Sequence, residues 1–365
     1  MMIRSWLAAV MRGEAPALAL ADYKELSEIL AVADEEGVVA LIHERLQHPE
    51  LAAMLSPELL HRFADAARLK AAASMMREAE CRRILKRLDQ EGLPVLLLKG
   101  SALAYSVYAS PHLRECSDID FLFATRQAAK QASVAICEGD YTQPGIAGEL
   151  ATYEMTCYRT RDASAYLEAD LHWGIGGSPI YADRFGFDEL FQASRPLPSL
   201  ASTARGLGLV HAYLHATTHR ALNLWLGIGD RLKWLYDLHL IGQRFTDPEW
   251  ENLVSVCLEK KLCGTCLDGL QSAADTFSTS IPNGVRERLS QGALKEPINM
   301  RRMRRWPYIQ MMNLRALPGL KMKARWLWQR LFPSGRFLHH YYGKNQGRLM
   351  ALTRYLRKGF SHLRG

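Results

Sequence analysis

Apolar residues recur at helical spacing through the first part of the chain, residues 1–90. The spacing in Tyr23–Ala33 and in Val38–Leu46 predicts two amphipathic helices. Residues 56–58, Ser-Pro-Glu, are typical of a capped helix start with proline at the first helical position. Arg62–Glu91 is rich in good helix formers and contains no Gly or Pro, which predicts one long helix that ends at Gly92.

The pattern changes after Gly92. Val95–Leu98 is a short, wholly apolar run, which suits a strand buried on both faces. The following stretches predict a helix, a strand, a helix and two further strands, over Ala102–Tyr108, Ser117–Phe123, Arg126–Cys137, Tyr153–Arg159 and Tyr166–Trp173. Helical spacing returns after Ala201 and predicts helices over Gly206–Leu222, Arg231–Ile241 and Pro248–Cys257.

These patterns predict an α+β protein with four regions. A helical region covers 1–90, a mixed core 91–200, a helical domain 201–300, and a basic, aromatic-rich segment 301–365. The length of 365 residues agrees with two or three packing units at roughly 100–200 residues each.

Composition excludes several classes of protein. Apolar residues make up 48% and charged residues 23%, which is close to the average for soluble globular proteins. No window resembles a spanning helix, and the first residues lack the apolar stretch of a signal peptide. The seven cysteines are an odd number scattered along a long chain, so we expect free thiols and a cytoplasmic location.

The net charge of +8 is distributed unevenly. Residues 301–365 contain 16 Lys and Arg and no Asp or Glu, whereas residues 1–300 contain 30 basic and 38 acidic residues. A basic segment interleaved with aromatic residues is typical of contact with nucleic acid or a membrane surface, and a peripheral membrane location is one expectation. The alternative is an ordinary helical cap whose aromatic residues are core and whose arginines face solvent and the acidic body.

Two aspartates one residue apart carry the candidate chemistry. Asp118 and Asp120 lie on a predicted strand, so their side chains leave the same face about 6.6–6.8 Å apart at the backbone. Two carboxylates directed at one point repel each other unless a cation lies between them, and Mg²⁺ prefers such oxygen ligands. Asp170 is the third candidate, with Glu168 on the same face of its strand as the alternative. Upstream, Gly100-Ser101 lies at a strand-to-helix turn, where free N–H groups favour an anion such as a triphosphate.

Three stretches carry a resemblance to a known family: LLLKGSALA at 96–104, LRECSDIDFL at 113–122 and DLHW at 170–173. With a fourth stretch from His215 to Leu238, they are similar to the uncharacterised nucleotidyltransferase group of the DNA-polymerase-β-like superfamily. The resemblance implies a small mixed sheet flanked by helices. It covers about residues 20–245.

The resemblance also implies roles for individual residues. Asp118, Asp120 and Asp170 would bind Mg²⁺ or Mn²⁺, and Asp170 would help to deprotonate an acceptor hydroxyl. The phosphates would be held by Gly100 and Ser101 and neutralised by the basic residues Lys99 and Arg114. An arginine often found after Gly-Ser in relatives is absent, and Phe121 stands where Leu is usual.

Several side chains have two interpretations from the sequence. Arg114 contacts phosphate or pairs with a nearby carboxylate such as Glu115 or Asp118, and His172 is catalytic or structural. The residues His211, His215 and His219 share one helix face, which suits either a metal site or packing against the cleft. Cys257, Cys263 and Cys266 are interpreted as small apolar residues of a buried helix rather than as zinc ligands.

The expected activity is transfer of an NMP, with AMP favoured, from an NTP to a hydroxyl of a small molecule, sugar, peptide or protein. A first alternative is an aminoglycoside-type or other antibiotic-modifying transferase, for which Glu149, Glu154 and Glu168 would supply an acidic cleft. A second is a non-catalytic nucleotide-binding or regulatory module of a biosynthetic complex.

Overall fold

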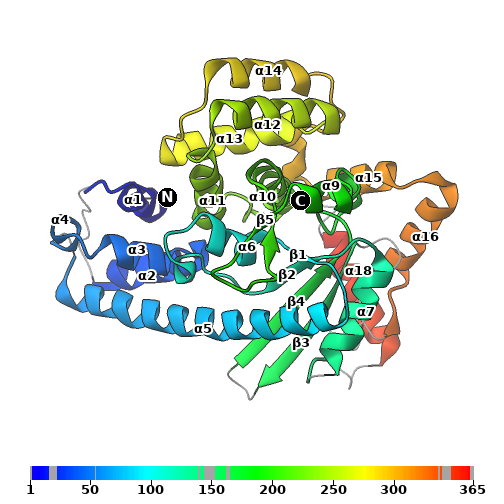
Figure 1. The fold of residues 1–365 in the computed structure, drawn as a ribbon, viewed down its shortest axis with the longest axis horizontal. Helices are drawn as coiled ribbons and strands as arrows, with labels where there is room; N and C mark the ends of the chain where they lie inside the picture. The colour runs from blue at the N-terminus through cyan, green and yellow to red at the C-terminus, as the bar shows by residue number, and fades with distance from the viewer. Residues whose placement is uncertain are drawn as a thin grey trace.

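The computed structural model describes residues 2–15, 23–53, 55–138, 140–143, 153–161, 165–335, 338 and 347–361. A small mixed sheet lies among helices that come from both ends of the chain (Figure 1). The expected α+β architecture is therefore confirmed.

Five helices precede the sheet: α1 (Met2–Met11), α2 (Tyr23–Glu36), α3 (Val39–Arg45), α4 (Pro49–Ala52) and α5 (Pro57–Gln90). The cap signal at residues 56–58 sets the start of α5, because the Ser56 hydroxyl accepts a hydrogen bond from the Leu59 amide at 3.3 Å. The long helix thus begins at Pro57, before the Arg62 start expected from composition. It spans 34 residues and runs along the base of the molecule in Figure 1.

The sheet has six strands in the order β3-β4-β2-β1-β6-β5. They are β1 (Leu96–Leu97), β2 (Ile119–Leu122), β3 (Glu154–Arg161), β4 (Ala165–His172), β5 (Arg195–Pro196) and β6 (Arg205–Gly206). Strand β2 pairs in parallel with β4 and antiparallel with β1. All four strands expected from the sequence are present, and the pair β5 and β6 was not expected.

Side chains of the central strands alternate between two cores. Leu97, Phe121 and Leu171 pack in the core shared with α5 and with α7 (Arg126–Cys137). Leu96 and Leu122 belong instead to the larger core on the opposite face. Asp120 has the same parity as Leu122 and therefore faces the larger core, on which α10 lies.

The other helices lie between and after the strands along the chain. After α6 (Lys99–Ser106) and η1 (Pro111–Leu113) they are α8 (Pro179–Ala182), α9 (Phe187–Gln192), α10 (Leu209–Asn223), η2 (Leu224–Leu226), α11 (Leu232–Gly242), α12 (Asp247–Lys260), α13 (Cys263–Phe277), α14 (Asn283–Ala293), η3 (Met300–Arg304), α15 (Trp306–Ala316), α16 (Gly319–Leu331) and α18 (Arg348–Ser361). A capping box of Thr246 and Glu249 starts α12.

All seven cysteines are free, as expected. Cys257, Cys263 and Cys266 are buried in the helical core, which confirms their interpretation as small apolar residues. None of the helices within the described ranges is long and apolar enough to cross a membrane.

Candidate active site

The register between β2 and β4 brings the second and third expected aspartates together. Asp120 lies opposite Asp170, and Leu122 lies opposite His172. Because side chains alternate along a strand, Asp120, Asp170 and His172 emerge on one face. One ligand atom from each residue lies within 4.8 Å of the other two, which makes this trio a candidate metal site.

A lysine contacts the same cluster. Lys99 opens α6 directly after β1, and its backbone adopts the left-handed conformation with φ +47°. Its Nζ lies 2.5 Å from Asp120 Oδ1, and His172 Nε2 donates to the same oxygen at 2.9 Å. Asp120 is only 1% exposed, so this carboxylate is fully enclosed by its two partners.

The cluster contains more carboxylates than cations. Burial alone would raise the pKa of Asp120, but Lys99 and His172 lower it well below its ordinary value. Burial and the nearby Asp120 raise the pKa of Asp170 to about 7. Burial and Asp120 likewise raise the pKa of Asp118. A bound cation would relieve this repulsion, because opposite charge stabilises the ionised form of each carboxylate.

Asp118 lies beside the trio without joining it. Strand β2 begins at Ile119, so Asp118 immediately precedes the strand rather than lying within it. Its side chain accepts a hydrogen bond from Ser117 at 3.2 Å, and its backbone oxygen accepts one from the Ser101 hydroxyl at 3.3 Å. Its expected role as a metal ligand stays a prediction.

Gly100 is required by a close approach of side chains to the backbone. A Cβ at this position would lie 2.5 Å from Cys116 Sγ and 3.2 Å from Arg114 Nη1. Gly100 also lies in the first turn of α6, where backbone N–H groups have no partner within the helix. Position 100 therefore requires glycine and lies at a helix start where several backbone N–H groups have no partner within the helix.

A cavity of about 130 Å³ adjoins this helix start and includes Gly100 and Asp118 in its wall. Lys233 and Trp234, at the start of α11, lie on its other side. Lys233 forms no ion pair with another described residue. Burial, followed by the neighbouring Arg114, lowers its pKa, and the more weakly acting Glu115 offsets this only in part. These features favour an anion in the cavity.

Arg114 has a protein partner instead. Its guanidinium donates from Nε and Nη2 to the two carboxylate oxygens of Asp237, each at 2.7 Å. Tyr108 donates to the same carboxylate at 2.7 Å. From the sequence, a nearby carboxylate such as Glu115 or Asp118 was the alternative partner of Arg114. The structure pairs it instead with Asp237 of α11. The expected contact of Arg114 with phosphate stays a prediction.

A second cavity, of about 430 Å³, opens on the other side of Lys99. Its wall includes the acids Glu154 and Asp170 and the amide side chains of Asn223, Gln310 and Asn313. The last two come from α15, which the sequence did not associate with the site. His172 Nδ1 is buried without a hydrogen-bond partner and lies 3.3 Å from Glu154 Oε2.

The histidines of α10 are packed and not gathered around a metal position. His215 and His219 line both cavities, whereas His211 lies 3.6 Å from Glu189 Oε1. Among the described residues the metal-compatible group consists of Asp120, Asp170 and His172, without these three. Packing of this helix face against the cleft is the interpretation that the geometry supports.

Asp120 and Asp170 thus lie paired on parallel strands, beside Lys99 and Gly100 at the start of α6. The chain belongs to the family described as "Uncharacterised nucleotidyltransferase", whose model matches residues 23–278. A search among curated proteins found no match. The matched range ends before α15, so Gln310 and Asn313 lie outside it.

Proposed function

We propose that this chain transfers an NMP, with AMP the first candidate, from an NTP to a hydroxyl of an acceptor molecule. The observation that carries the proposal is the pairing of Asp120 with Asp170 across parallel strands. That pairing directs the buried carboxylate of Asp120 and the half-buried one of Asp170 at one point, next to an amide-rich helix start. Membership of a nucleotidyltransferase family supports the same reaction class.

The donor atoms fit a divalent cation. Carboxylate oxygens from Asp120 and Asp170 are hard ligands of the kind that Mg²⁺ and Mn²⁺ prefer, and Asp118 would complete the set. Two such ions would supply Lewis-acid stabilisation of the charge on the reacting phosphate and on the departing pyrophosphate.

The protein's own amides and side chains would bind the phosphates and accept the proton of the acceptor. The first-turn amides at Gly100 and Ser101 would bind the phosphates, with Lys233 neutralising charge from across the 130 Å³ cavity. Lys99 lies between the two cavities and would hold the reacting phosphate near the carboxylates. Asp170 would accept the proton of the acceptor hydroxyl, while Thr156 orients it by donating to Oδ1 at 2.6 Å.

The acceptor would occupy the 430 Å³ cavity, which Asp170 reaches from one side. Amide side chains in its wall suit an acceptor that carries hydroxyl groups, such as a sugar. Glu154 in the same wall would also suit a cationic acceptor, which keeps the aminoglycoside-type alternative as the second candidate. Of the other acids expected for that alternative, Glu149 lies outside the described residues.

The test is a transfer assay with each of the four α-³²P-labelled NTPs, in Mg²⁺ or Mn²⁺, with cell lysate or an aminoglycoside as acceptor. Wild type should move label to an acceptor and release pyrophosphate. Asp120→Asn and Asp170→Asn should each abolish transfer. Asp89→Asn is the matched control, because Asp89 is an exposed aspartate of α5 that does not belong to the metal-compatible group.

Circular dichroism would establish that each variant is folded. Transfer by folded Asp120→Asn at the wild-type rate would overturn the proposed mechanism. Metal-dependent NTP binding without transfer to any acceptor would favour the non-catalytic nucleotide-binding module instead. Cytoplasmic location and the choice of ATP remain predictions within this proposal.

A further inference from the structure

Exposed large apolar side chains are concentrated on one short helix. Thirteen such side chains occur among the described residues, and five of them lie within positions 320–332. They are Leu320, Leu327, Trp328, Leu331 and Phe332, with exposures of 85%, 45%, 64%, 49% and 50%. Isolated exposed apolar residues need no explanation, but a contiguous group on one helix marks an interaction surface.

The four residues of this group that lie within α16 form one stripe. At 3.6 residues per turn, Leu320, Leu327, Trp328 and Leu331 fall within an arc of about 100°. Ala324, which is also exposed, falls in the same arc. Trp328 and Phe332 are in ring contact, with centroids 4.4 Å apart, which extends the stripe past the end of the helix.

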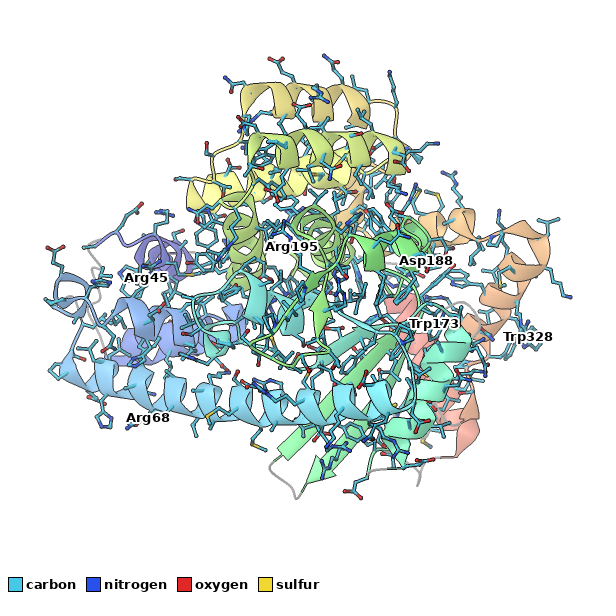
Figure 2. The ribbon with its side chains drawn as sticks, in the orientation of Figure 1. Arg45, Arg68, Trp173, Asp188, Arg195 and Trp328 are labelled. Atoms are coloured by element: carbon cyan, nitrogen blue, oxygen red, sulfur yellow. The ribbon has the colours of Figure 1, made fainter. Side chains whose placement is uncertain are left out.

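The stripe is not the face that attaches α16 to the protein. Trp326 is 5% exposed and packs with Met322 against Leu314 and Leu317. Trp326 and Met322 lie on the opposite side of α16 from the stripe. Figure 2 shows Trp328 at the outer edge of the molecule, directed away from the body. The helix therefore has one apolar face that is packed and another that is presented to the surroundings.

Cations border the presented face on both sides. By the same helical spacing, Lys321 and Arg325 flank the stripe on one side and Lys323 flanks it on the other. Positions 301–365 contain 16 basic residues and no acidic one. A surface that is apolar in the middle and cationic at its borders is complementary to an apolar layer covered by anionic groups.

We propose that α16 docks on the surface of an anionic lipid bilayer and lies in its plane. The stripe enters the boundary between headgroups and acyl chains, with Trp328 at the interface, while Lys321, Lys323 and Arg325 contact acidic headgroups. Leucines at the centre of the stripe favour a bilayer over nucleic acid, because a nucleic-acid surface offers phosphates and bases but no aliphatic layer to receive them.

The test is sedimentation of the full chain with vesicles of phosphatidylcholine, with and without phosphatidylglycerol. We expect binding to the anionic vesicles that weakens with added salt, and little binding to phosphatidylcholine alone. The variant Leu327→Ser/Trp328→Ser/Leu331→Ser should reduce partitioning by roughly tenfold or more. Leu294→Ser is the matched control, since Leu294 is 87% exposed but isolated from the stripe, and it should bind as wild type does.

A charge variant, Lys321→Glu/Arg325→Glu, tests the border without changing the apolar stripe. It should lose binding to anionic vesicles, and thermal unfolding would establish that both variants are folded. Absence of vesicle binding by wild type would overturn the proposal, as would equal binding by the triple serine variant. Self-association abolished by the serine substitutions, without vesicle binding, would assign the stripe to a second copy and also overturn it. Tighter binding to a single-stranded oligonucleotide than to anionic vesicles would do the same.

Discussion

At the scale of single residues, Lys99 is the cation on which the carboxylate cluster depends in the absence of metal. Its ammonium lies 2.5 Å from Asp120 Oδ1, and Asp118, Glu154 and Asp170 also act on it. Burial lowers the pKa of Lys99, but these carboxylates raise it further, so the side chain stays charged. Removing one partner of a buried pair leaves the other charge uncompensated, at a cost of about 3–5 kcal/mol.

Lys99→Met should therefore lower the melting temperature of the metal-free protein. Mg²⁺ should then raise the melting temperature of the variant more than that of wild type, because a bound cation replaces the lost charge. Differential scanning fluorimetry with and without Mg²⁺ measures both effects. Lys86→Met, on the exposed side of α5, serves as control. Equal melting temperatures for Lys99→Met and wild type without metal would contradict this account of Lys99.

For Lys233, unlike Lys99, we expect substitution to leave the stability of the protein unreduced. It lines the cavity beside Gly100, and burial with Arg114 nearby lowers its pKa. Lys233→Met should weaken Mg²⁺-dependent ATP binding by roughly tenfold or more, since a partly desolvated cation close to phosphate is lost. The variant should be as stable as wild type or more stable, because Lys233 has no ion pair that the substitution would break.

Calorimetric titration with ATP measures the loss of affinity, and an unchanged affinity would remove Lys233 from the proposed phosphate site. The exposed Lys295→Met should bind ATP as wild type does.

At the scale of elements, α10 carries two buried histidines, His211 and His215, and the half-buried His219, and their burial opposes protonation. Burial lowers the pKa of His215 to about 3 and lowers the pKa of His211 and His219 as well. A histidine in the unfolded chain titrates near about 6.5. Below that pH the unfolded state binds protons that the folded state does not, so stability falls as pH falls. The stability is fully present above about 6.5 and is lost progressively toward the folded pKa.

Acidification from pH 7 to pH 5 should thus remove the stability that these histidines contribute, by up to about 1.4 kcal/mol per pH unit for each. His215→Gln should make the dependence shallower, whatever its effect on stability at pH 7. Urea unfolding at a series of pH values measures the slope. Substituting the exposed His112 by Gln should leave the slope as it is in wild type. An unchanged slope in His215→Gln would show that His215 is not held neutral by its surroundings.

Elements with strong local signals could be predicted from the sequence. Helix α7 has the expected bounds, because Thr125 caps it and its amide partner is Ala128, three residues on. Strands β5 and β6 could not be predicted, because two residues each give no periodicity and their pairing depends on neighbours distant in sequence. The same holds for α15, whose Gln310 and Asn313 reach the 430 Å³ cavity only through the tertiary fold.

Part of the candidate site could likewise be predicted from the sequence, and part could not. Asp120 and Asp170 could be predicted, because the motif spacing places each on a strand. Their direct opposition required the parallel register, which no local pattern contains. The segment Arg231–Leu238 was visible as a resemblance, yet nothing in the sequence showed that its Asp237 would pair with Arg114 across 123 positions. Long-range ion pairs depend on the assembled fold.

At the scale of the whole molecule, one core joins the regions that the sequence separates. The larger core includes Leu41 of α3, Leu122 of β2 and Leu238 of α11, among many others. The boundary near residue 200 stays a prediction, and buried residues on both sides of it, Leu190 and Leu207, belong to this same core. We therefore expect a single cooperative unfolding transition, measured as coincident curves by circular dichroism and tryptophan fluorescence.

The pair of Arg114 and Asp237 makes this coupling measurable, because it links the segment before β2 to α11. Both side chains are buried, at 6% and 3% exposure. Arg114→Met leaves the Asp237 carboxylate buried with only the Tyr108 hydroxyl as a donor, and should destabilise the protein by about 3–5 kcal/mol. Adding Asp237→Asn removes the stranded charge while keeping an acceptor for Tyr108. The double variant should therefore be more stable than Arg114→Met alone.

Urea unfolding of the two single variants and the double variant gives the coupling energy directly. Because the larger apolar core still joins both regions, Arg114→Met should unfold in one transition, with the helical domain losing structure together with the sheet. If the double variant is as unstable as the sum of the two single variants, the pair contributes no coupling, and the regions are joined by apolar packing alone. If Arg114→Met instead separates the unfolding into two transitions, the ion pair is what makes residues 91–200 and 201–300 fold as one unit.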